Sequence, residues 1–316
     1  MKRFLLHVAS FTLTITLLLS AITWFTDRGL HKSRFSWYED WNGVNNGTIN
    51  ADVLIMGSSH ARRGIHPMIV DSILHVNSYN LGMDGYMFDM QLARYHMYRK
   101  RNKAPKLIIL CVDYSEFSAT KRLIDPGQLL PYLQDDEVRE DAVKMGMPAY
   151  LQYLPFLKYQ DHPMLVWKAG CALTQAHTDR PDSYKGFYGE HLEWNTTTFQ
   201  QFMGEHTYLA PELSDGVVQQ FTQFLDSCSK EQIKVVLVFT PHYYLFTRAV
   251  RYRDSYIAFL SAIAAQHHTQ LLNYNTDSMC YNTRYFGNGT HLSPKGVTLF
   301  SQKLCTDLRL DGHILK

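Results

Sequence analysis

The chain has 316 residues, enough for two domains of about 150 residues each or for one large α/β domain. Hydrophobic residues make up 46% of it and charged residues 19%, a balance that excludes wholesale disorder, collagen and a coiled coil. The 31 Lys and Arg residues nearly balance the 29 Asp and Glu residues, so the net charge gives no reason to expect a nucleic acid partner.

The five cysteines are scattered along the chain and form no C-x-x-C pair, so they predict neither a zinc site nor a disulfide scaffold. We expect mostly buried thiols, with Cys280 and Cys305 as the pair to test for a disulfide if the protein is exported. The 15 histidines lack the H-E-x-x-H spacing of metal ligands. We therefore expect no metal and no cofactor.

An apolar run at residues 5–25 contains no charged side chain and follows Lys2 and Arg3. At a helix rise of about 1.5 Å per residue, its length spans the ~30 Å apolar layer of a membrane. Trp24 and Phe25 close the run as interfacial aromatic residues do, and the basic amino end favours a cytoplasmic start. We therefore predict a single-pass membrane protein whose remaining chain is extracytoplasmic, either periplasmic or at the cell surface.

A cleaved signal peptide fits the same amino-terminal features, although no A-x-A cleavage site follows the apolar run. Both alternatives remain open at this point. The predicted organisation is an anchor or signal peptide at 1–27, a juxtamembrane linker at 28–50 and an α/β domain at 51–316.

Four short apolar runs, at 53–56, 107–112, 235–239 and 271–274, have the pattern of strands that are buried on both faces. Helical patterns separate these runs. The alternation predicts a mainly parallel sheet with helices on both faces, a three-layer α/β/α fold. In such sheets the functional groups gather beyond the carboxyl ends of the strands.

The alternation stops between about 121 and 215, where aromatic residues are frequent. We interpret this region as an insertion in the α/β domain. It is either a lid over a substrate groove or a set of helices packed on the main domain, and the sequence leaves both interpretations open.

The first predicted strand runs directly into Gly57, Ser58, Ser59 and His60, ahead of a predicted helix. A hydroxyl group at a strand-to-helix turn is exposed above the sheet, and the free N–H groups of the helix lie close to it. Gly-Ser-Ser turns are also common helix caps, so this segment alone does not define a nucleophile.

A second candidate, His291, lies in a loop that follows the last predicted strand, so the same edge of the sheet would carry both Ser59 and His291. With these two segments the sequence resembles the SGNH, or GDSL-like, hydrolase superfamily, in its membrane-anchored branch of polysaccharide and teichoic-acid O-acylation proteins. The resemblance covers about 51–304, apart from the middle, and implies a flavodoxin-like fold.

The resemblance also assigns roles. Ser59 takes the position of the nucleophile, and His291 that of the general base that removes its proton. The Asn80-Leu81-Gly82 segment resembles the second conserved block, in which the glycine N–H joins the N–H of the nucleophile in an oxyanion hole.

Two positions depart from the pattern of this superfamily. Asn288 stands where the triad Asp is expected, and an amide orients the imidazole without neutralising the imidazolium. The site would then have low activity, use a Ser-His dyad, or borrow a carboxylate such as Asp277. Asp113 stands where an oxyanion-binding Asn is expected, and we interpret it as a structural cap or a contact of Arg62 or Arg63.

Arg62 and Arg63 follow the nucleophile within the predicted helix and are candidates for binding an anionic sugar such as a uronate, or they belong to a solvated helix face. His60 and His242 are alternative bases, or hydrogen-bonded structural histidines.

The resemblance implies an O-acyl esterase or O-acyltransferase that acts on a cell-surface polysaccharide or other acylated glycan. The expected partners are the membrane and a membrane acyl-transfer machinery. The alternative is a catalytically inactive glycan-binding or assembly subunit that retains the fold.

Overall fold

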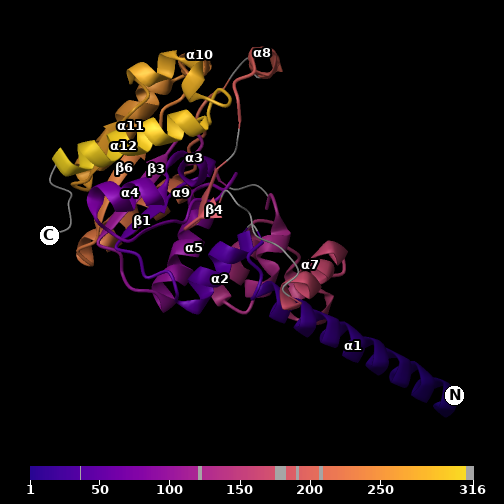
Figure 1. Cartoon of the computed structure of the whole chain (residues 1–316). Coiled ribbons are helices and arrows are strands. Elements are labelled where there is room, and N and C mark those ends of the chain that lie inside the picture. The colour runs from indigo at the N-terminus through magenta and orange to yellow at the C-terminus, as the bar shows by residue number, and fades with distance from the viewer. Residues whose placement is uncertain (36, 120–122, 175–182, 190–191, 206–208, 311–316) are drawn as a thin grey trace. The chain divides into compact units, whose positions relative to one another are not determined.

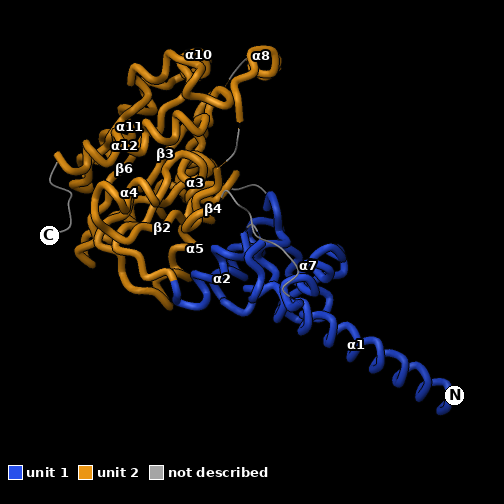
Figure 2. Tube along the Cα trace, viewed as in Figure 1, with its two compact units in different colours: residues 1–48, 121–181 blue, residues 49–120, 182–316 orange. Residues whose placement is uncertain are grey.

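The computed structural model describes residues 1–35, 37–119, 123–174, 183–189, 192–205 and 209–310 (Figure 1). The chain forms two compact units (Figure 2). Unit 1 combines Met1–Thr48 with Lys121–Pro181, and unit 2 combines Ile49–Thr120 with Asp182–Lys316. The predicted insertion is therefore divided between the units.

Unit 1 begins with the helix α1, Lys2–Leu30, which is long and apolar enough to cross a membrane. Its last turns pack against α7, Pro163–Leu173, where Gly29 lies so close to Ala169 that a Cβ atom would collide with the Ala169 backbone. The carboxylate of Asp27 pairs with Lys158 at 2.7 Å. Polar and small residues at the end of α1 thus fix it to its own unit.

The segment 28–50 is not a linker along its whole length, because it contributes α2, Trp37–Asn46, to the core of unit 1. Trp41 is fully buried, stacks on Tyr132 and donates from Nε1 to Gln128 at 3.1 Å. Tyr38 donates to the Gly127 carbonyl at 3.0 Å. The other elements of unit 1 are η1 Pro126–Gln128, η2 Leu130–Tyr132, α6 Asp136–Lys144, η3 Ala149–Gln152 and η4 Pro155–Leu157.

Unit 2 is built on a parallel five-stranded sheet in the order β2-β1-β3-β6-β7. The strands are β1 Val53–Met56, β2 Ser78–Asn80, β3 Leu107–Val112, β6 Lys234–Phe239 and β7 Gln270–Asn273. The four predicted strands are confirmed. The strand β2 was not predicted, because Ser-Tyr-Asn is short and lacks the continuous apolar run of the others.

Helices cover both faces of this sheet. On one face, Val53, Ile109 and Val236 belong to a core that includes residues of α4 and α12. On the other face, Phe239 contacts Tyr256 of α11. The helices of unit 2 are α3 Ser59–Gly64, α4 Pro67–Leu74, α5 Phe88–Arg101, α8 Thr196–Glu205, α9 Asp215–Lys230, α10 Tyr244–Ala249, α11 Arg253–Gln266 and α12 Pro294–Leu310.

Shorter elements complete unit 2. The strands β4, Ser183–Tyr184, and β5, Phe187–Tyr188, form a hairpin whose Lys185 carbonyl accepts from the Asn80 N–H at 2.9 Å. The turns η5, Ser278–Tyr281, and η6, Thr283–Tyr285, lead into the loop before α12. All five cysteines are free thiols, so Cys280 and Cys305 do not form the disulfide considered above.

Candidate active site

Ser59 lies directly beyond the carboxyl end of β1, as the first residue of α3. Gly57 makes the turn, with φ at 139° and no space for a Cβ atom, which would lie 2.7 Å from the Cys111 carbonyl oxygen. Ser58 caps the helix, since its hydroxyl accepts from the His60 N–H. The half-buried hydroxyl of Ser59 is thus held above the edge of the sheet.

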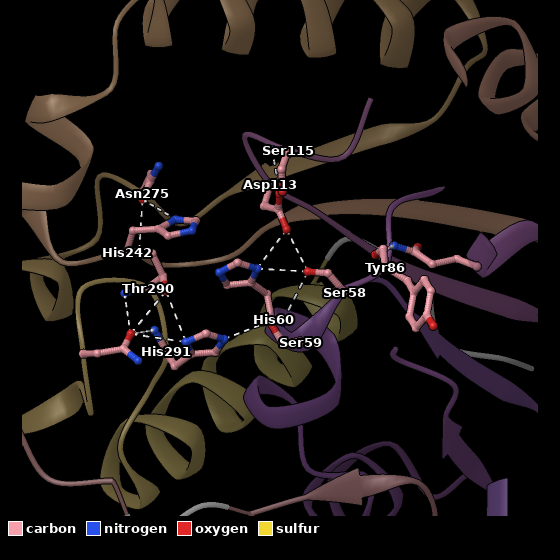
Figure 3. Close-up of polar contacts among 12 residues, drawn as sticks. Ser58, Ser59, His60, Tyr86, Asp113, Ser115, His242, Asn275, Thr290 and His291 are labelled. Carbon is pink, nitrogen blue, oxygen red and sulfur yellow. Dashed lines mark hydrogen bonds and ion pairs between the residues drawn. The ribbon is translucent and has the colours of Figure 1, made fainter. Parts of the chain in front are cut away.

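The structure brings His291 to this hydroxyl from 232 positions further along the chain. Its Nε2 lies 2.8 Å from Ser59 Oγ (Figure 3). The loop that carries His291 is closed by a bridge between Phe286 and Leu292 and by a hydrogen bond from the Gly287 N–H to the His291 carbonyl, at 2.9 Å.

Asn288 fixes the tautomer of this imidazole. Its Oδ1 accepts from the backbone N–H groups of Thr290 and His291, at 2.9 and 2.8 Å, so this atom is the amide oxygen. It lies 3.2 Å from His291 Nδ1, and Thr290 Oγ1, which donates to the same Asn288 oxygen, lies 3.1 Å from that nitrogen. Two oxygens that can accept at Nδ1 favour the tautomer with the proton on this nitrogen. The lone pair of Nε2 is left to accept the Ser59 proton, as a general base requires.

Burial lowers the pKa of His291 to about 3, and the positive charges of His60 and Arg63 act in the same direction. The imidazole is therefore neutral at pH 7 and available as a base. The borrowed carboxylate considered above is engaged elsewhere, because Asp277 caps η5 and pairs with Lys303 at 3.2 Å. The base is oriented by an amide, and its imidazolium form gains little stabilisation from this partner.

Asp113, directly after β3, is the structural cap considered above and not the contact of Arg62 or Arg63: its Oδ1 accepts from the Ser115 N–H at 2.7 Å, and it also binds the start of α3. Its Oδ2 accepts from His60 Nδ1 at 2.8 Å and from Ser58 Oγ at 2.7 Å. The reason is topological, since β1 and β3 are neighbours and Asp113 therefore follows the strand beside Ser58.

Burial by itself would raise the pKa of Asp113, but the charge of His60 and hydrogen bonds from His60, Ser115 and Ser58 outweigh burial and lower it below its usual range. Asp113 is thus an ionised, buried carboxylate. In a Ser-His-Asp triad the serine and the carboxylate contact opposite nitrogens of the imidazole. Here Ser58 and Asp113 both lie at Nδ1 of His60, so Ser58, His60 and Asp113 do not form a second triad.

His242, the other alternative base, lies beyond β6 and is fully buried. Its Nδ1 lies 3.2 Å from Asn275 Oδ1, and burial lowers its pKa to about 3. Asn275 follows β7 and also donates to the Tyr114 hydroxyl at 2.9 Å. Sequence reasoning missed Asn275 and Ser115, although their position just beyond a predicted strand was the available signal.

Asn80 and Gly82 do not form the expected oxyanion hole in this structure. The Gly82 N–H already donates to Asn80 Oδ1 at 2.9 Å, and Asn80 Nδ2 donates to the carbonyls of Ala61, in α3, and of Ile65, which directly follows α3. Gly82 is needed for close packing, because a Cβ atom there would lie 2.5 Å from the Arg62 backbone nitrogen. The N–H of Ser59, at the first position of α3, remains as the candidate oxyanion donor, since the first N–H groups of a helix have no intrahelical acceptor.

The two arginines face an acidic partner within unit 2. Arg63 donates from Nε and Nη2 to the two Asp84 carboxylate oxygens, at 3.0 and 2.9 Å. Arg62 is buried, with Nη1 3.6 Å from Asp84 Oδ2. Both guanidinium groups lie over Tyr188. A single carboxylate thus faces both guanidinium groups, and the binding of an anionic sugar by Arg62 and Arg63 stays a prediction.

Within the described part of the chain, no group of three or more His, Cys, Asp or Glu side chains is placed to hold a metal ion. The site thus consists of an alcohol, Ser59, and an oriented, neutral imidazole, His291, at the carboxyl edge of a parallel sheet.

No protein-family model matches this chain, and a comparison with curated proteins finds no match.

Proposed function

We propose that the protein is an SGNH-like O-acyl esterase or O-acyltransferase that works through a Ser59-His291 dyad. The 2.8 Å contact between Ser59 Oγ and His291 Nε2 carries this proposal, together with the Asn288 amide that fixes the tautomer of the base. The strand order β2-β1-β3-β6-β7 is also the 2-1-3-4-5 order of flavodoxin-like sheets, which supports the proposed superfamily.

In the proposed reaction Ser59 Oγ attacks the carbonyl carbon of an ester while His291 Nε2 takes the hydroxyl proton. The new Oγ–C bond replaces the bond to the alcohol, which leaves with the proton from His291. Water or a sugar hydroxyl then attacks the carbonyl carbon of the acyl-serine and gives its proton to His291. The acyl–Oγ bond breaks, and His291 returns this proton to Ser59 Oγ. Hydrolysis and transfer differ only in this acceptor.

Two features favour slow turnover. The imidazolium that forms during attack lies beside the Asn288 amide instead of a carboxylate, and the Gly82 N–H is bound to Asn80. Removal of a single oxyanion donor costs about 10²–10³ in kcat in a serine protease. The same features favour the second candidate function, a catalytically inactive glycan-binding or assembly subunit.

The proposed location follows from α1, whose length and apolar composition suit a membrane anchor. With the basic amino end in the cytoplasm, unit 2 would meet its substrate outside the cytoplasm. A cell-surface polysaccharide or other acylated glycan is the substrate that we propose there, with the membrane and an acyl-transfer machinery within it as partners.

Fluorophosphonate labelling tests the proposal directly. We expect a stoichiometric adduct at Ser59 in the full chain, lost in Ser59→Ala and strongly slowed in His291→Ala. Ser261→Ala, which removes an exposed serine of α11, is the matched control and should label normally. Labelling that persists in Ser59→Ala would refute the assigned nucleophile, and no labelling of the folded protein would favour the inactive subunit.

A further inference from the structure

A cavity of about 480 Å³ lies beside the catalytic base, within unit 2. The loop 287–291 forms one wall and contributes Asn288 and His291. Leu192 and the α8 residues Thr198, Phe199 and Phe202 form the other. A larger cavity, of about 700 Å³, is lined by residues at the amino ends of β6 and β7 and so lies at the opposite end of the strands from Ser59.

Glycines allow the two walls of the smaller cavity to meet. A Cβ atom at Gly289 would lie 2.8 Å from Phe199 Cε2, and one at Gly287 would collide with Leu192. Phe199 is buried and packs against Trp194 and Tyr243, with ring centroids 4.9 and 5.5 Å apart. The α8 wall is thus fixed to the loop that positions His291.

The walls have the chemistry of an apolar ligand site. Two phenyl rings and one leucine line the cavity, and most of its exposed lining is apolar, although Glu193 and Asn195 also belong to it. The described lining contains neither Lys nor Arg to pair with an anionic sugar. A methyl group is close in size to a water molecule, whose share of liquid volume is about 30 Å³. The cavity is therefore far larger than an acetyl group needs and lies within the range of about 300–1,000 Å³ of small-molecule sites.

We infer that this cavity binds the acyl chain of the ester, and that the substrates are esters of aliphatic acids longer than acetate. The inference rests on the proposed function, because a chain that is transferred must lie beside the atoms that transfer it. His291 lines the cavity and is the partner of Ser59, which is not itself a lining residue, so an acyl group on Ser59 Oγ would reach the phenyl rings of α8 by passing His291.

A series of p-nitrophenyl esters tests the inference, because the leaving group stays constant while the acyl chain grows from acetate to butyrate and octanoate. For the full chain we expect kcat/KM to rise about fourfold for each methylene group that becomes buried. Thr198→Trp, which fills the cavity from α8, should remove this gain, so that the ratio of kcat/KM for octanoate to kcat/KM for acetate falls to about one.

Gln200→Trp is the matched control, since it places the same side chain on the same helix at an exposed position outside the cavity. It should keep the chain-length preference of the native protein. Circular dichroism of both variants establishes that α8 and the sheet are intact.

The outcomes separate the inference from the proposed function. If Ser59 reacts with fluorophosphonate but acetate is hydrolysed as fast as octanoate, the cavity does not bind the acyl chain and this inference is wrong, while the serine enzyme stands. An equal loss of octanoate activity in Thr198→Trp and Gln200→Trp would also overturn it. If Ser59 reacts with no probe, the proposed function fails and the acyl assignment fails with it.

Discussion

The imidazole ring of His60 lies parallel to that of His291, with centroids 5.2 Å apart and planes within 4° (Figure 3). His60 is in turn bound to the buried carboxylate of Asp113. A ring that is anchored by the residue after β3 is thereby held against the imidazole that we propose as the base. Burial is the larger cause of the lowered pKa of His291, and the electrostatic effect of His60 acts in the same direction, so the two rings couple the Asp113 network to the proposed dyad.

Asn288→Asp should increase activity, because a carboxylate would stabilise the imidazolium of His291 in the transition state. We expect kcat for p-nitrophenyl butyrate to rise about tenfold, an effect worth about 1.4 kcal/mol. The acidic limb of the pH–rate profile should shift to higher pH, because a neighbouring negative charge raises the pKa of His291.

Asn282→Asp is the control for this prediction. Asn282 caps η6 and accepts from the Arg284 N–H, so the substitution adds a carboxylate to a neighbouring loop. Its rate should remain that of the native protein. An unchanged rate in Asn288→Asp would show that the missing carboxylate does not limit turnover.

The His60–Asp113 pair should contribute far more to stability than a comparable surface pair. Their side chains are 14% and 4% exposed, so the removal of one partner leaves a buried charge or donor unpaired. We expect Asp113→Ala to lower the free energy of unfolding by about 3–5 kcal/mol. Urea denaturation of Asp113→Ala, of His60→Ala and of the double variant gives the coupling energy between the two side chains.

His267 and Asp226 form the matched pair, with a similar distance of 2.7 Å but with Asp226 57% exposed. Asp226→Ala should cost no more than about 1 kcal/mol, because water screens the carboxylate. Equal costs at the two sites would contradict the assignment of Asp113 as a buried, ionised partner of His60.

Stability should rise with pH between about 4.5 and 6.5. His242 and His291 have pKa values of about 3 in the folded chain, against an ordinary value near 6.5 in the unfolded chain. In this window the unfolded chain binds protons that the folded chain does not, so stability is fully present above pH 6.5 and is lost as the pH falls. Each such histidine contributes a slope of about 1.4 kcal/mol per pH unit.

Urea denaturation at pH 4.5, 5.5 and 7.5 measures this dependence. His242→Gln retains a polar side chain beside Asn275 and should reduce the slope by the contribution of one histidine. A free energy of unfolding that stays constant across the window would show that these imidazoles are not buried in their neutral form.

Gly82→Ala should destabilise unit 2, because the added Cβ atom would lie 2.5 Å from the Arg62 backbone nitrogen. Overpacking of this kind costs about 1–3 kcal/mol. Gly64→Ala is the control, since the space around that position is open within 4 Å and the residue lies in α3. Thermal denaturation should show a lower midpoint for Gly82→Ala alone, and equal midpoints would mean that Gly82 does not need to lie against α3.

The anchor assignment predicts that the full chain is extracted from membranes by detergent and not by high salt or alkaline carbonate. About twenty apolar residues of α1 would have to leave the membrane for the protein to be released without detergent. Immunoblotting of the membrane and soluble fractions provides the measurement. Recovery of the intact chain in the salt wash would refute the anchor.

Features that depend on a local residue pattern were predictable before the fold was known. A strand buried on both faces needs a continuous apolar run, so four strands of the sheet could be predicted, whereas the three-residue β2 could not. A membrane helix needs an unbroken apolar stretch, which α1 provides. The order of strands and loops also predicted that Ser59 and His291 belong to the same edge of the sheet.

Which donors and acceptors meet at that edge depends on the folded arrangement and was not predictable from local pattern. Asp113 pairs with His60 because β3 lies beside β1. The Gly82 N–H is occupied because the side-chain oxygen of Asn80, two residues earlier, accepts from it. The segment 28–48 belongs to a packed unit because Trp41 and Tyr38 find partners about 90 positions away. Hydrogen bonds and packing of this kind join residues that are distant in the chain, so no local periodicity records them.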